Sequence, residues 1–192
     1  KDISSSISTL TDEGWALFSS KDYIQSRKKF QEAIVASFVS SIYDSISNEA
    51  KLGRAWATIF AQESSDFAMT SYIDFDFLKP NSVKLSSKSK KDAWAGLSIS
   101  GVLLNSQGAD TYSSNVVSTA VYLLESSPNY EFSYNTKINY KDVRYALIQA
   151  YYNLSDYANA ASHLDILDPV NAPHSATPES LLIAIQALGG QL

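Results

Sequence analysis

The side chains that could carry catalysis are few in this chain. The 192 residues include two histidines, His163 and His174, and no cysteine. The zinc-binding spacing H-E-x-x-H, the nucleophile motif G-x-S-x-G and a glycine-rich phosphate loop are all absent from the sequence. We therefore expect a protein that is not an enzyme, with no catalytic residue, no metal site and no cofactor.

One pair of carboxylates, Asp74 and Asp76, has a spacing that could place both groups on one face of a strand. Apolar residues alternate with them over 73–77, and a second alternation of aromatic residues covers 130–134. Alternation with a period of two is typical of an extended segment with one buried face. The sequence thus predicts two extended inserts, with the two aspartates on the solvent face of the first.

Composition limits the partners and the location. The net charge is −5, so the chain lacks the basic footprint of a nucleic-acid-binding protein, and no nucleic-acid partner is expected. No run of apolar residues approaches the roughly 18 needed to span a membrane. A serine-rich, tyrosine-rich composition with modest charge favours an exported protein, at an extracellular, periplasmic or cell-surface location. A cytoplasmic location stays open.

Most of the chain shows the apolar periodicity of helices. Short polar breaks divide it into helix pairs, and proline and glycine mark the later boundaries. We therefore expect an all-α fold. The predicted hairpins cover about 10–39, 47–78, 92–125 and 141–168, and a last helix at 179–188 is expected to cap the final pair.

Residues 1–9 are polar except for Ile3 and Ile7. They hold too little apolar surface to become ordered by themselves. We expect an extended N-terminal arm that uses the two isoleucines for assembly. The arm would dock on a neighbouring subunit or beside one of the inserts, near Phe75 or Phe132.

The two outer helix pairs carry the residues of a known repeat. The first pair has a small residue, a turn tyrosine, a phenylalanine and an alanine in the expected order, and the last pair has matching residues up to its closing proline. The middle pairs keep the small and aromatic positions of their first helices. These residues are Gly14, Tyr23, Phe30 and Ala33; Tyr151, Tyr157, Ala160 and Pro169; and Gly53, Trp56, Trp94 and Gly96.

This pattern resembles the tetratricopeptide repeat family, in the form found in exported proteins and lipoproteins of bacteria. The resemblance covers about residues 10–188 and departs from the family at Ile148, where glycine is usual. It implies a single domain over 10–192, built as a right-handed α-solenoid of about four hairpins with a C-terminal capping helix and the two inserts. It predicts a fold far better than it predicts a function.

The resemblance also implies a concave groove lined by the first helix of each pair. The groove positions here are mainly apolar or aromatic, which disfavours the peptide-carboxylate clamp of some family members. Packing of these side chains in the core is an open alternative. The predicted groove residues are Trp15, Phe18, Trp56, Phe60, Ile99, Tyr145, Gln149 and Tyr152.

Three functions fit these features. The first is a non-catalytic scaffold that binds a peptide, a helix or another copy of the chain in the groove. The second is a structural subunit that self-assembles into a homo-oligomer, a fibre or a surface assembly. The third is a glycan-binding surface protein that uses exposed aromatic side chains.

Overall fold

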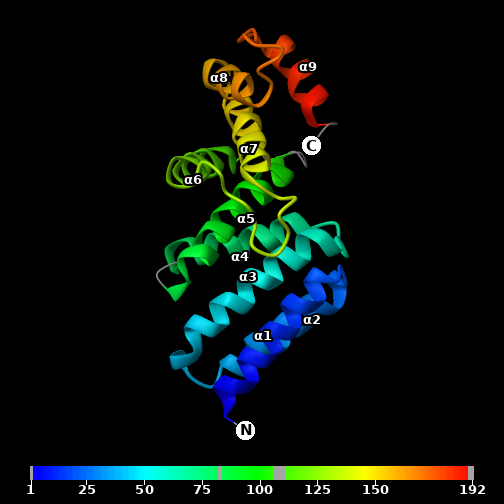
Figure 1. The fold of residues 1–192 in the computed structure, drawn as a ribbon, viewed down its shortest axis with the longest axis vertical. Helices are drawn as coiled ribbons and strands as arrows, with labels where there is room; N and C mark the ends of the chain where they lie inside the picture. Colours follow the sequence, from blue (N-terminus) through cyan, green and yellow to red (C-terminus); the bar gives the residue numbers. More distant parts are fainter. Residues whose placement is uncertain (1, 82–83, 106–110, 190–192) are drawn as a thin grey trace.

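The chain is helical over most of its described length, which confirms the all-α fold class (Figure 1). The computed structural model describes residues 2–81, 84–105 and 111–189. The predicted hairpins and last helix match observed helices to within a few residues, apart from the N-terminus and the ends of α4 and α5. The helices are α1 (Ile3–Ser19), α2 (Tyr23–Ser37), a short 3-10 helix η1 (Ser41–Tyr43), α3 (Asp44–Ala61), α4 (Phe67–Asn81), α5 (Ser87–Asn105), α6 (Ser113–Ser126), α7 (Tyr140–Asn153), α8 (Tyr157–Leu167) and α9 (Pro178–Gly189).

The turns before α2 and α8 share one local geometry. Lys21 and Ser155 both adopt a left-handed backbone, with φ of 67° and 59°. An aspartate follows in each case, and the carboxylates of Asp22 and Asp156 each accept a hydrogen bond from a backbone N–H of the next helix. Such a cap satisfies a donor that the start of a helix would leave unpaired. In the polar breaks before α2 and α8, the aspartate of an Asp-Tyr pair is therefore the helix N-cap.

The helices pack in chain order along one axis of the molecule (Figure 1). Each helix contacts the next one in the sequence, and α1, α3, α5 and α7 also contact one another in succession. The odd-numbered helices thus form one continuous row. Side chains far apart in the sequence are brought together along this row.

Phenylalanines of the even-numbered helices fill the places where odd-numbered helices approach most closely. A Cβ atom added at Gly14 would lie 2.7 Å from the Phe30 ring, and one added at Gly53 would lie 2.2 Å from the same ring. Phe75 meets Gly96 in the same way, at 2.2 Å. These distances are shorter than van der Waals contact, so a larger side chain would force the ring to move. Glycine is needed here because it allows close approach.

A buried serine precedes each of these two phenylalanines by one helical turn. The Ser26 hydroxyl donates a hydrogen bond to the carbonyl oxygen of Gly14 at 2.9 Å, and the Ser71 hydroxyl donates one to that of Ala55 at 3.1 Å. Each bond ties the second helix of a pair to the first. The same contact therefore occurs in two successive helix pairs.

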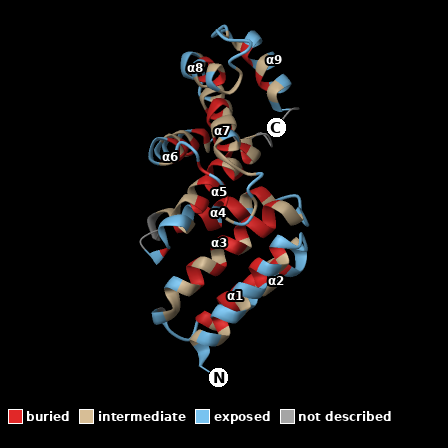
Figure 2. Ribbon diagram, viewed as in Figure 1, coloured by how far each residue is buried: buried red, intermediate tan, exposed pale blue. Residues whose placement is uncertain are grey.

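Buried side chains are concentrated between the helices of the row (Figure 2). The main core extends from Ile7 on α1 to Leu147 on α7. A separate cluster joins α7, α8 and α9, in which Leu181 and Ile185 of α9 pack with Ile148 and Leu164. The last helix thus buries apolar side chains of α7 and α8, as predicted for 179–188.

The extended arm predicted for residues 1–9 is wrong. Helix α1 begins at Ile3, and the Asp2 carboxylate caps it by accepting a hydrogen bond from the backbone N–H of Ser4. Ile7 is fully buried in the main core, whereas Ile3 is 42% exposed. Helix formation satisfies the backbone groups of this segment within the chain, so the two isoleucines do not form a free assembly arm.

The first extended insert is also wrong. Residues 73–77 lie within α4, where Phe75 is buried and Ile73 and Phe77 are largely exposed. Asp74 is buried and makes a two-pronged ion pair with Arg54 at 2.9 and 2.6 Å, so it is not on a solvent face. The second insert, around 130–134, is irregular backbone with an isolated antiparallel bridge between Glu131 and Asn139.

The packing of Phe30 between two glycines gives a test of the fold. Gly53→Ala should lower the free energy of unfolding by about 1–2 kcal/mol, because overpacking of about 1–3 kcal/mol outweighs the helix propensity gained. Chemical denaturation would measure the loss. Phe30→Leu should relieve the clash, so the double variant should lose less stability than the sum of the single variants. Strict additivity would contradict the proposed contact.

Candidate functional site

The loop between α6 and α7, residues 127–139, covers part of the row of odd-numbered helices. Its Phe132 is fully buried, and the ring lies 4.2 Å from that of Trp56 and 5.8 Å from that of Phe18 between centroids. The Tyr134 ring stacks on Trp15 at 3.6 Å, with an angle of 2° between the planes. The loop therefore places two aromatic side chains on the surface where a groove was predicted.

Three predicted groove residues belong to the core as a result. Trp15, Phe18 and Trp56 are 6%, 2% and 1% exposed. For Trp15 and Phe18 the groove prediction is wrong, because loop residues and neighbouring helices already cover them. The sequence left open that these side chains pack in the core, and the structure shows this packing for Trp15 and Phe18. Trp56 is buried as well, yet one edge of it still lines an open pocket.

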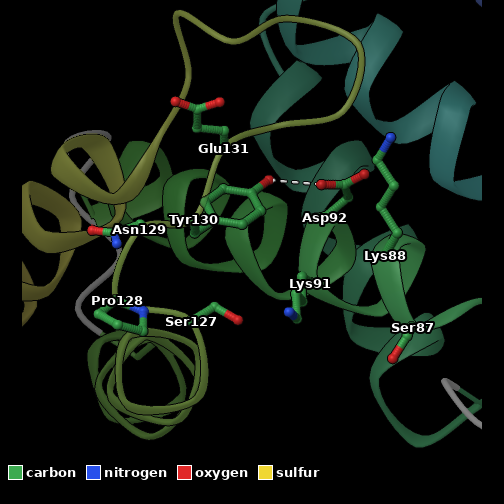
Figure 3. Close-up of a pocket in the computed structure, with 9 residues that line it drawn as sticks. All are labelled: Ser87, Lys88, Lys91, Asp92, Ser127, Pro128, Asn129, Tyr130 and Glu131. Carbon is green, nitrogen blue, oxygen red and sulfur yellow. Dashed lines mark hydrogen bonds between the residues drawn. The ribbon is translucent and has the colours of Figure 1, made fainter.

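A buried carboxylate holds the loop in place (Figure 3). Asp92 lies within α5 and is 1% exposed, although the sequence placed it at the start of a helix. The Tyr130 hydroxyl, reaching from the loop, donates a hydrogen bond of 2.9 Å to its carboxylate. The backbone carbonyl of Asp92 accepts a further bond of 3.2 Å from the indole nitrogen of Trp56. Asp92 thus joins α3, α5 and the loop.

Burial raises the pKa of Asp92 to about 6, while the neighbouring loop residues Ser133 and Tyr130 act in the opposite direction. Burial also raises the pKa of Tyr130 well above its ordinary value, and the adjacent Asp92 charge acts in the same direction. A carboxylic acid and a phenol with raised pKa values can be a functional pair. Here both groups face the interior and bind each other, which suits an anchor better than an acid-base pair.

A cleft of about 530 Å³ lies beside this anchor. Lys88 and Lys91 of α5 line it together with Glu131 and polar residues of the loop (Figure 3). Charges of both signs meet in this cleft, so it offers no strong field to an anion or a cation.

An apolar pocket of about 370 Å³ opens on the other side of the loop, over α3, α5 and α7. The structure brings five predicted groove residues together in its wall. The complete lining is Trp56, Ile59, Phe60, Ile99, Val102, Leu103, Ile138, Asp142, Tyr145, Ala146 and Gln149. Such a lining, mostly apolar with a few polar groups, is typical of a binding pocket.

Sequence reasoning missed one important member of this wall, Asp142. Its carboxylate accepts a hydrogen bond of 2.8 Å from the backbone N–H of Asn139 and completes the capping box of α7. Burial raises its pKa, against backbone hydrogen bonds that lower it. The Lys141-Asp142 pair signals a helix start in the sequence, but nothing there shows that the cap faces a pocket.

The remaining predicted groove residues have different surroundings. Tyr145 lines the pocket and also donates a hydrogen bond of 3.0 Å to the backbone carbonyl of Ile185, so it ties α7 to α9. Tyr152 lies apart from the pocket, with its ring 5.5 Å from that of Tyr157 in the C-terminal cluster. It is not brought together with the other groove residues.

Both histidines make contacts within the chain. His163 stacks on Tyr151 and lies 2.9 Å from the Arg144 guanidinium; burial and then that charge lower its pKa. The His174 ring contacts Asp165 at 2.7 Å. Over the described ranges, no group of three or more metal-binding side chains occurs. No helix among those residues is long and apolar enough to cross a bilayer.

The Asp92 anchor predicts a pH dependence of stability. Its pKa is about 6 in the fold and 3.8 ordinarily, so the folded chain binds this proton more tightly. The resulting stability, about 3 kcal/mol, is present below pH 4 and is lost as the pH rises through 6. Asp92→Asn should therefore gain stability relative to wild type between pH 4 and pH 7, measured by denaturation at each pH. Asp76→Asn, at an exposed position of α4, serves as the control, and a pH-independent difference for Asp92→Asn would refute the anchor.

Comparison with known proteins identifies no relative: no protein-family model, no curated protein and no solved structure matches this chain. Any assignment of function therefore depends on the geometry of the chain itself.

Proposed function

We propose that the chain is a non-catalytic scaffold that binds another protein in the open apolar pocket. The proposal includes a right-handed solenoid of tetratricopeptide type, in which α1, α3, α5 and α7 form the concave side. The observation that carries it is the convergence of Trp56, Phe60, Ile99, Tyr145 and Gln149 on one pocket. Their positions came from the groove of that family, and three helices are needed to assemble them.

The character of the pocket supports a protein ligand. The lining is mostly apolar with a few polar groups, as in pockets that bind ligands, and the pocket is open rather than enclosed within the core. An apolar side chain of a partner could displace water from Ile99 and Phe60 on two different helices. Burial of such an anchor side chain contributes about 1.5–3 kcal/mol, the scale of an interface hot spot.

The alternatives have less support. Self-assembly was argued from a free N-terminal arm, but residues 3–9 form part of α1 and Ile7 lies in the core of its own chain. Glycan binding and an exported location stay predictions from composition.

A pair of isoleucine substitutions tests the proposed function. Ile99→Ser on α5 removes an apolar wall of the pocket, whereas Ile73→Ser on α4 makes the same change at a position that is 58% exposed and outside the pocket. In affinity purification from the source organism, Ile99→Ser should reduce recovery of the bound partner about tenfold, equivalent to 1.4 kcal/mol. Ile73→Ser should retain it. Circular dichroism would verify that both variants fold, and identical partner sets would reject the pocket as the binding site.

A further inference from the structure

The α6–α7 loop shows which kind of ligand this row of helices accepts. Its backbone is irregular and rich in turns, and backbone hydrogen bonds pair its two legs, from Phe132 N–H to the Ile138 carbonyl and from Tyr140 N–H to the Tyr130 carbonyl. Between these legs the Phe132 ring is inserted against Trp56. One part of the row is thus already filled by an irregular segment of the chain with an aromatic anchor, Phe132.

The open pocket continues that filled region. Trp56 contributes to both, because Phe132 stacks on it while its remaining edge lines the pocket. Ile138, at the end of the loop, forms the wall between them. A partner segment in the pocket would therefore lie beside the loop and present a large apolar side chain to Phe60 and Ile99, much as Phe132 is presented to Trp56.

The charge of the pocket adds a second requirement. Asp142 is the one charged residue in the lining, and its carboxylate forms no ion pair within the described part of the chain. A purely apolar ligand would cover this carboxylate and remove water from it without replacement, which is unfavourable. A lysine or arginine on the ligand would supply the missing counter-charge. The chain as a whole, at −5, also attracts a basic segment.

We propose that the pocket binds a peptide segment of a partner protein that carries a large apolar side chain next to a lysine or arginine. The apolar side chain enters between Phe60 and Ile99, and the basic group pairs with Asp142. This inference rests on the proposed protein-binding function and adds the chemistry of the partner. A pocket of this kind would prefer a basic ligand, whereas a peptide-carboxylate clamp prefers an acidic group.

Selection from a library of random linear peptides displayed on phage tests this inference. Wild type should enrich sequences in which a large apolar residue lies within two positions of lysine or arginine. Asp142→Asn should keep the apolar preference and lose the basic one. The asparagine oxygen can still accept the hydrogen bond from Asn139, so the α7 cap is retained.

A synthetic peptide from the wild-type selection then gives the affinity. Asp142→Asn should weaken its binding by about tenfold, and Asp76→Asn, the same change on α4 outside the pocket, should leave the affinity unchanged. Apolar peptides without a basic preference would overturn this inference and leave the protein-binding function standing. If no peptide is enriched, or if the enriched peptides bind Ile99→Ser equally well, the proposed function fails as well.

Discussion

The close approach of successive odd-numbered helices is the constraint on which the rest of the structure depends. Phe30 is held between Gly14 and Gly53, and Phe75 fits against Gly96, at distances that leave no room for a Cβ atom. These contacts fix how far α1, α3 and α5 lie from one another. The spacing in turn sets which side chains meet along the row, and therefore where Phe132 of the α6–α7 loop can insert and where the open pocket remains.

The loop divides this row into a filled part and an open part. Phe132 and Tyr134 cover most of Trp15, Phe18 and Trp56, so these aromatic side chains contribute mainly to stability. The buried Asp92–Tyr130 bond holds the loop there. Without the loop, a wide apolar surface would face solvent on α1 and α3. The proposed binding pocket lies next to the filled region, because Trp56 contributes to both.

Sequence periodicity was sufficient to predict most helices and the turns between them, because helices and turns depend on residues that are close together in the sequence. The Asp-Tyr turns and the glycine positions are local patterns: the aspartates cap α2 and α8, and the glycines meet phenylalanine rings. The errors arose where an apolar residue fits two periods. Ile73, Phe75 and Phe77 alternate as in a strand, yet Phe75 also lies four residues after buried Ser71 on one face of α4. Ile3 and Ile7 similarly fit one face of a helix. For the candidate site, the sequence predicted five of the pocket residues. It did not predict the rest, because no local pattern shows that a distant loop covers Trp15 or that the cap residue Asp142 faces a pocket.

A carboxylate at the edge of an apolar pocket influences selectivity more than affinity. Asp142 already stabilises the start of α7 through its bond to Asn139, so the fold itself keeps it in position and little ordering is needed when a ligand arrives. In the proposed pocket, desolvation would discriminate against neutral and acidic ligands, because each of them would cover the charge without compensating it. A basic ligand regains in the ion pair what it loses in hydration. Apolar contact area on α3 and α5 can therefore supply most of the binding energy while one residue on α7 determines which ligands can use it.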